Sequence, residues 1–102
     1  MSEYTSLEVS KRLADAGFNE TSDDRYNDAG TIPTDAYRAD TLLAWLLTKG
    51  WRCDEQYRDS KCYVLADLYG DYSPIHRHEE ASAPTLPDAL AEVVMKVIKV
   101  AK

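Results

Sequence analysis

A chain of 102 residues is long enough for one hydrophobic core and too short for two, so we expect a single domain over residues 1–102. Its apolar share of 44% is ordinary for a globular protein, and its net charge of −6 argues against direct binding to nucleic-acid phosphates. The longest apolar stretch, Leu42–Leu47, is far too short to span a bilayer, so no membrane association is predicted.

The cysteine content and the N-terminal residues predict the cellular setting. Cys53 and Cys62 are too few for the disulfide framework of a small secreted domain. The first residues lack the basic start and apolar run of a signal peptide. We therefore expect a soluble cytoplasmic protein. Seven acids and two arginines lie between Asp15 and Asp40. This acidic segment is interpreted as solvated surface, with the binding of a basic partner as the alternative.

The first element is marked at both ends. Thr5 and Glu8 have the spacing of a capping box, in which the threonine caps the helix and the glutamate reaches back to the cap. Gly17 suits a left-handed helix end. Phe18 follows at the position from which a Schellman motif packs an apolar residue against Leu13. These signals predict a helix between the threonine and the glycine.

A second helix is predicted over the strongly apolar run Thr41–Lys49, which Gly50 ends in the same way. Its start is left open, because several polar side chains between residues 34 and 40 can cap it. The segment before it, Ser22–Pro33, is polar and rich in turn residues. That segment holds at most a short hairpin around Asn27–Gly30.

From Trp51 onward apolar and polar residues alternate, which is typical of β-strands. A turn at Asp59–Ser60 pairs the two runs as an antiparallel hairpin with one buried face. That face carries Trp51, Cys53, Tyr57, Cys62, Val64, Ala66 and Leu68. The same register puts Cys53 opposite Ala66, too far along the strands from the second cysteine for a disulfide. Both cysteines are therefore predicted to be free, buried thiols.

A second tight turn is expected at Gly70–Asp71, followed by an edge strand over Tyr72–Glu80. The outward face of the resulting sheet then carries Tyr63, Leu65, Tyr69, Tyr72, His76 and His78. Exposed patches rich in tyrosine are typical of binding surfaces, so these six side chains are the candidate binding residues. The alternative is that the first helix, or the polar loop after it, packs over them as a second small core.

The last helix is the clearest element. Thr85 and Asp88 have the spacing of a cap, and apolar residues follow the 3.6-residue period from Leu86 to Ala101. This helix is expected to cover the apolar face of the sheet. The predicted fold class is therefore α+β: a three-stranded antiparallel meander with about three helices, the C-terminal one packed on the apolar face.

Two features bear on chemistry. His76 and His78 project from one face of a strand and can reach one metal ion, but the neighbouring strand offers no third ligand, so no metal site is assigned. The chain lacks a glycine-rich phosphate loop, a nucleophile elbow and an HExxH motif. An enzyme is therefore the less favoured class, and no cofactor is predicted.

Several segments together resemble a group of small proteins encoded in bacteriophage and prophage genomes. The resemblance is carried by Tyr4–Leu13 with Gly17, Ile32–Pro33, Thr41–Leu43 and Leu86–Leu90, in this order. It is most specific in the N-terminal motif YTSLEVSKRL. The resemblance implies a viral origin and a setting in the host cytoplasm, and it brings no established activity with it.

The favoured function is a non-enzymatic interaction module that binds a host or viral protein, for example as an inhibitor of host defence. One alternative is a small metal- or ligand-binding protein that uses the strand with His76 and His78. The other is a structural or assembly subunit, for which a homodimer is left open.

Overall fold

The computed structural model describes residues 4–26, 34–69 and 76–101. Its elements, in chain order, are α1 (Leu7–Ala16), β1 (Asp24–Tyr26), β2 (Thr34–Ala36), α2 (Ala39–Thr48), β3 (Trp51–Arg58), β4 (Lys61–Tyr69), β5 (His76–Ala83) and α3 (Leu86–Ala101). β3, β4 and β5 form one antiparallel sheet in that order, and β1 pairs with β2 as a separate hairpin.

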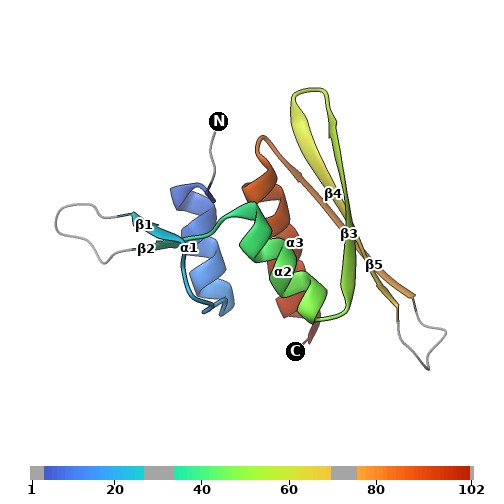
Figure 1. Ribbon diagram of the computed structural model, residues 1–102, viewed down its shortest axis with the longest axis horizontal. Coiled ribbons are helices and arrows are strands. Elements are labelled where there is room, and N and C mark those ends of the chain that lie inside the picture. Colours follow the sequence, from blue (N-terminus) through green and yellow to red (C-terminus); the bar gives the residue numbers. More distant parts are fainter. Residues whose placement is uncertain (1–3, 27–33, 70–75, 102) are drawn as a thin grey trace.

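The helices lie on one side of this sheet (Figure 1). α3 contacts β4 and β5, α2 contacts β3, and the two helices pack against each other. α1 packs on α3 and on β2, on the side of α3 away from the sheet. This arrangement confirms the predicted α+β fold, in which the C-terminal helix covers the apolar face of a three-stranded antiparallel sheet.

The core is centred on α3, whose apolar residues recur with the helical period. Ala89, Leu90, Ala91, Val93, Val94 and Val97 are all buried. They meet Trp51, Val64 and Ala66 on the inner face of the sheet. The fully buried side chains of Leu42 and Leu46 on α2 complete this part of the core.

The N-terminus of α1 differs from the expected capping box. Ser6 is the cap, and its hydroxyl accepts the N–H of Val9 at 3.3 Å. Thr5 is instead fully buried and paired with Tyr37, whose carbonyl accepts the Thr5 N–H at 2.9 Å. The Thr5 hydroxyl accepts the Tyr37 N–H at 3.2 Å and lies 2.6 Å from the hydroxyl of Ser10. The helix starts one residue later than expected because this long-range pairing occupies the N–H and the hydroxyl of Thr5.

The ends of α1 and α2 are as predicted. Gly17 has φ of +99°, and the N–H of Phe18 bonds to the Leu13 carbonyl at 3.0 Å, as a Schellman motif requires. Phe18 is buried, edge-on to the ring of Tyr37 at 4.7 Å. Gly50 likewise has φ of +89° where α2 passes into the sheet. α2 itself begins at Ala39, inside the region where its start was left open, with Arg38 at the N-cap position.

The start of α3 also differs from the expected cap. The Thr85 hydroxyl is buried and, within the described part of the chain, has no hydrogen-bond partner. Asp88 in the first turn accepts the N–H of Ser6 at 2.8 Å, so it ties the start of α1 to the start of α3. Arg12 and Glu92 form an ion pair further along the same two helices. Asp88, which was predicted to cap its own helix, therefore links α3 to the start of α1.

The β1–β2 hairpin joins the first two helices. Arg25 pairs with Asp35 in the ladder, and the two side chains form an ion pair at 3.0 Å. At most a short hairpin within Ser22–Pro33 was expected, and β2 lies after that segment. The connection between β1 and β2, including Asn27–Gly30, lies outside the described residues.

The first turn of the main sheet is confirmed. The second, expected at Gly70–Asp71, lies outside the described residues, and the strand pairing beside it differs from the prediction. Asp59 and Ser60 both have positive φ, 52° and 61°, and the register places Cys53 opposite Ala66. The third strand starts later than expected. A tight turn at Gly70–Asp71 would pair Tyr69 with Tyr72, whereas β4 and β5 pair Tyr69 with His76 and continue to Ala83. The displacement is four residues, an even number, so every side chain of β5 keeps its predicted face.

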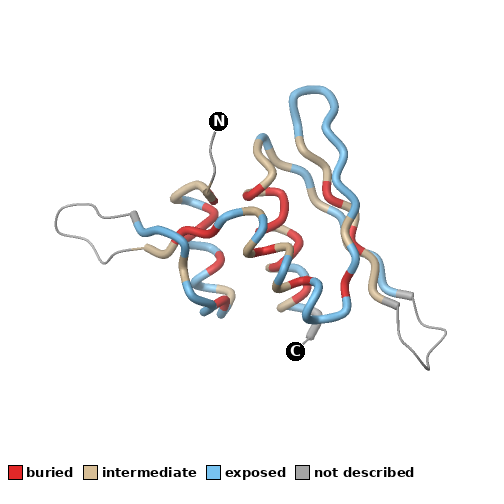
Figure 2. The backbone as a smooth tube through the Cα atoms, in the orientation of Figure 1, coloured by how far each residue is buried: buried red, intermediate tan, exposed pale blue. Residues whose placement is uncertain are grey.

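The inner face of the hairpin is only partly buried. Trp51, Val64 and Ala66 are buried, whereas Cys53, Cys62 and Leu68 are half-buried. Tyr57 was expected inside and is 72% exposed. The reason is that the turn end of β3 and β4 extends beyond the helices, where Figure 2 shows exposed backbone. Both cysteines are free, as predicted, although neither is fully buried.

We predict that Thr5→Val lowers the free energy of unfolding by about 1–3 kcal/mol, because it leaves the buried N–H of Tyr37 without its acceptor at nearly constant volume. Denaturant unfolding of the two proteins measures the change. Thr48→Val is the matched control, since the hydroxyl of Thr48 is exposed and bonds within its own helix. Equal losses for the two variants would contradict the role assigned to Thr5.

We also predict that Cys53 alkylates slowly at neutral pH. Burial raises the pKa of its thiol to about 11, and the negative charges of Glu55, Asp54 and Asp67 add to the effect. At pH 8 such a thiol holds roughly a hundredfold less thiolate than an unperturbed cysteine. A Cys62→Ser variant isolates Cys53 for mass spectrometry. Its rate should rise about tenfold per pH unit through pH 9 and 10, and a plateau near pH 8 would contradict the assignment.

Candidate binding face on the outer side of the sheet

The outer face of the sheet is made by alternate residues of all three strands. Residues directly opposite one another in a ladder share a face, and here Gln56 pairs with Tyr63, which pairs with Ser82. In the next such row, Leu65 lies between Asp54 and Glu80. The described helices all lie against the other side, so within the described residues nothing is layered on this face (Figure 1). The alternative of a second small core formed by α1 over these residues is therefore not what the structure shows.

The candidate binding residues are placed as follows. Tyr63 and Leu65 lie next to each other on the outer face, both half-buried by neighbouring side chains. His78 lies on the same face, opposite Asp67. Tyr69 and His76 form a backbone pair on this face, but their side chains, and all of Tyr72, lie outside what the structure describes.

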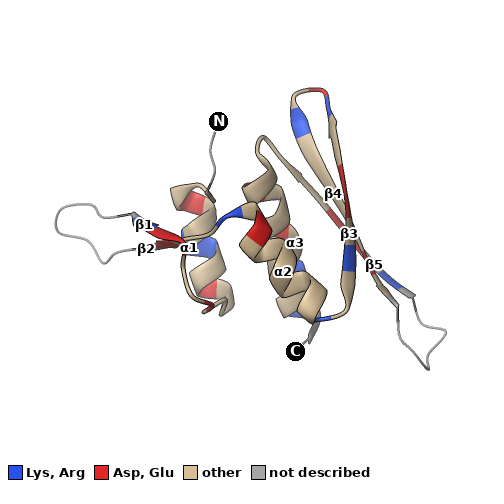
Figure 3. Ribbon diagram, in the orientation of Figure 1, with Lys and Arg blue, Asp and Glu red and all other residues tan. Residues whose placement is uncertain are grey.

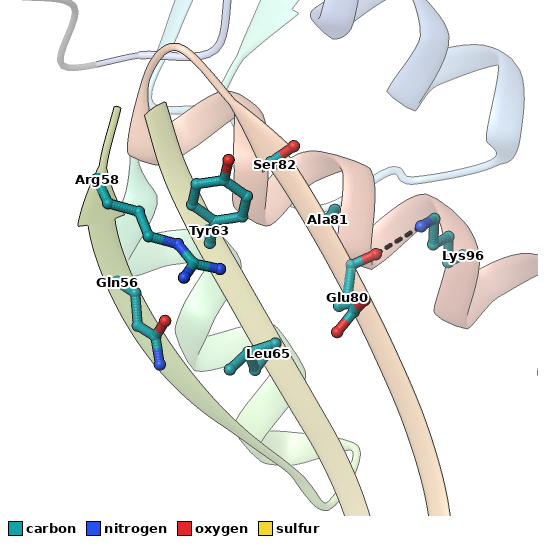
Figure 4. A pocket seen from close by; sticks show the side chains of 8 residues that line it. All are labelled: Gln56, Arg58, Tyr63, Leu65, Glu80, Ala81, Ser82 and Lys96. Atoms are coloured by element: carbon teal, nitrogen blue, oxygen red, sulfur yellow. Dashed lines mark hydrogen bonds between the residues drawn. The ribbon is translucent and has the colours of Figure 1, made fainter. Parts of the chain in front are cut away.

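A shallow recess of about 370 Å³ lies on this face around Tyr63 (Figure 4). The guanidinium of Arg58 lies over the ring of Tyr63, 4.7 Å from its centre. Lys96 reaches the rim from α3 and donates a hydrogen bond to the backbone carbonyl of Glu80. The lining residues are Gln56, Arg58, Tyr63, Leu65, Glu80, Ala81, Ser82 and Lys96. An apolar floor with cationic and amide groups at its rim suits the side chains of a protein partner.

Sequence reasoning missed the polar part of this recess. The predicted hairpin register already placed Gln56 and Arg58 on the outer face, so the signal for them was present in the strand alternation. Lys96 had no such signal, because α3 belongs to the opposite layer and only the folded structure brings this side chain around the edge of β5.

His78 forms an ionic cluster next to the recess, with Glu80 common to both. Its Nδ1 lies 2.8 Å from a carboxylate oxygen of Asp67 and its Nε2 lies 3.2 Å from one of Glu80. These hydrogen bonds, first to Asp67 and then to Glu80, raise the pKa of His78 above its ordinary value of 6.5. Two carboxylate partners favour an imidazolium that donates from both nitrogens, whereas a metal ligand needs a free nitrogen lone pair. No group of three His, Cys, Asp or Glu side chains within the described residues is arranged to hold a metal ion.

Apart from Asp40 on α2, the described acids of the acidic segment lie toward the end of the molecule away from this face (Figure 3). Some of its acids have structural partners: Asp23 accepts the N–H of Arg38 at 2.9 Å, and Asp35 pairs with Arg25. These contacts hold the β1–β2 hairpin to the chain that leads into α2. They give the acids a role in the fold, and the candidate face lies elsewhere.

Comparisons of the chain with protein-family models, with curated proteins and with solved structures found no match in any of the three. Within the described residues, none of the helices has the length and apolar character needed to cross a membrane.

We predict that His78 titrates with a midpoint above 6.5 in the folded protein. Its raised pKa means that the ion pairs add stability below the pKa of the unfolded chain, and that this contribution is lost as pH rises through the folded pKa. Proton NMR of a His76→Gln variant follows the single remaining imidazole. Asp67→Asn in that background should lower the midpoint, since Asp67 is the largest cause. A His78 midpoint at or below 6.5 in the His76→Gln protein, before Asp67 is replaced, would contradict the hydrogen bonds assigned to His78.

Proposed function

We propose that this protein is a non-enzymatic interaction module that binds another protein through the outer face of its sheet. The observation that carries the proposal is the placement of Tyr63 and Leu65 on a face that no described helix covers. Half-buried apolar side chains on an uncovered face lose further contact with water when a partner docks.

The composition of the face supports protein recognition. Tyrosine and arginine are enriched among the residues that dominate binding energies, and here Arg58 is stacked on Tyr63 at the recess. The stacking lowers the mobility of both side chains before binding, which reduces the entropy that a partner has to overcome. The charged and amide groups around them form a polar rim of the kind found at interfaces.

The placement of the reactive side chains favours binding over catalysis. Both cysteines belong to the inner face of the sheet, whereas His78 lies on the outer face. A thiol nucleophile and an imidazole base must share a face to act together. The raised pKa of Cys53 also keeps its thiol protonated near neutral pH.

The nature of the partner follows from charge and from resemblance. A net charge of −6 repels nucleic-acid phosphates, so we propose a protein partner. The resemblance to small phage-encoded proteins favours a host or viral protein in the host cytoplasm, including a component of host defence.

The test is affinity capture of the partner from infected host lysate with the wild-type chain and a Tyr63→Ser/Leu65→Ser variant. If the face binds, the double substitution should weaken binding of the captured protein by about 2 kcal/mol or more, roughly thirtyfold in Kd. Isothermal titration calorimetry with the purified partner measures the change. The variant should still unfold cooperatively, because neither side chain belongs to the buried core.

Leu47→Ser is the matched control for an exposed apolar side chain away from the face. Leu47 is 55% exposed on α2, so this substitution should leave the affinity unchanged. Equal affinities for the wild-type chain and the double variant would contradict the proposed face. Loss of cooperative unfolding in the double variant would show that the two side chains are core residues, which also contradicts it.

A further inference from the structure

The edge of the sheet formed by β3 is open to pairing. Within the described residues β3 has one neighbour, β4, and no strand lies on its other side. Residues 54–58 of β3 are exposed on both faces of the sheet (Figure 2). The opposite edge differs, because Lys96 already bonds to the Glu80 carbonyl of β5. An unpaired strand edge is a template for pairing with another chain.

The turn determines which backbone groups face this open edge. In a hairpin closed by a two-residue turn, the flanking residues form a hydrogen-bonded pair, and bonded and non-bonded pairs alternate from there. Arg58 and Lys61 are the flanking pair here. Alternation therefore directs the N–H and C=O groups of Glu55 and Tyr57 away from β4. A second strand can exchange backbone hydrogen bonds with these two residues.

Charge excludes two of the ways in which β3 could pair with its own copy. When two copies of a strand pair antiparallel about a two-fold axis, one residue lies opposite its own copy, and we call this residue the centre of the pairing. If Asp54 is the centre, two aspartates lie opposite each other. A centre at Glu55 sets two glutamates together and also opposes Arg52 to Arg58. Like charges directly opposite in a ladder are destabilising.

Two further centres fail for other reasons. A centre at Tyr57 opposes Glu55 to Asp59, again a like-charge pair. A centre at Cys53 places Tyr57 of one copy opposite Lys49 of the other. Lys49 is the C-cap residue of α2 and precedes the start of β3 at Trp51, so Tyr57 would have no strand residue to pair with.

A centre at Gln56 satisfies both the charges and the backbone. It sets Asp54 of each copy opposite Arg58 of the other, twice by symmetry, and it sets Glu55 opposite Tyr57, the residues whose backbone groups face the edge. Within the described part of the chain, neither Asp54 nor Arg58 forms an ion pair of its own. Arg58 stacks on the ring of Tyr63, but this contact leaves its positive charge without an acidic partner among the described residues, so both charges can pair with a second copy.

We propose that two copies of this chain pair antiparallel along β3, centred on Gln56, to form one continuous six-stranded sheet. Residues that face each other in a ladder lie on the same side of the sheet, so the two outer faces become one surface with the helices of both copies behind it. This dimer goes beyond the proposed function, because it uses the strand edge and not Tyr63 or Leu65, although Gln56 and Arg58 also line the recess. A contact of five residue pairs is shorter than a standard interface, so the dimer exchanges with monomer as concentration changes.

Sedimentation equilibrium over a concentration series tests the proposal. The mean mass of the wild-type chain should rise from 11.5 kDa toward twice that value. Asp54→Arg and Arg58→Asp should each raise the dimer dissociation constant roughly tenfold or more, because each places like charges opposite each other twice. The double variant with both substitutions exchanges the two charges and should restore dimerisation.

Arg52→Asp is the control, since Arg52 faces Ser60 in this register and faces Asp54 only in the rejected register centred on Cys53. It should leave the dissociation constant unchanged. A wild-type chain that stays at 11.5 kDa up to its solubility limit would overturn the proposal. So would a dimer that either single charge reversal leaves intact, or one that the double variant fails to restore. Circular dichroism confirms that each variant is folded, which is expected because all three side chains are exposed.

Discussion

The apolar surface of α3 is the feature on which the rest of this fold depends. One helix contacts α1, α2, β4 and β5, and its residues from Ala89 to Val94 are buried with the exception of Glu92. A chain of this size supports a single core, and here that core surrounds one helix. Because α1 and α2 are both held against α3, neither is left to cover the other side of the sheet. That no described helix covers the outer face is thus a consequence of how the core is built.

The features that sequence predicts well are those decided by a few neighbouring residues. The left-handed ends at Gly17 and Gly50 are examples, because few residues other than glycine adopt positive φ without strain. The turn at Asp59–Ser60 is another, since strand alternation on both sides leaves one register that buries Val64 and Ala66. The fold class followed from these local signals and from the strong helical period of α3.

The features that sequence missed depend on long-range contacts. Thr5 and Ser6 are both good caps, and only pairing with Tyr37, far along the chain, decides between them. The start of β5 depends on pairing with β4, for which the glycine at position 70 was a misleading signal. Tyr57 has the correct parity for burial, but the helices end before they reach it. For the candidate face, the alternation of side chains along the strand identified Tyr63 and Leu65. Lys96 could not be identified in this way, because it reaches the recess only once α3 is packed against the sheet.

The central claim is that β4 has one face against the helices and one face against solvent. Solvent paramagnetic relaxation enhancement along β4, measured by NMR with a soluble gadolinium chelate, tests it most directly. We expect strong enhancement for the side-chain protons of Tyr63 and Leu65 and weak enhancement for those of Val64 and Ala66. Weak enhancement at all four residues in the monomeric protein would show that something covers the outer face, and it would contradict this arrangement of the sheet.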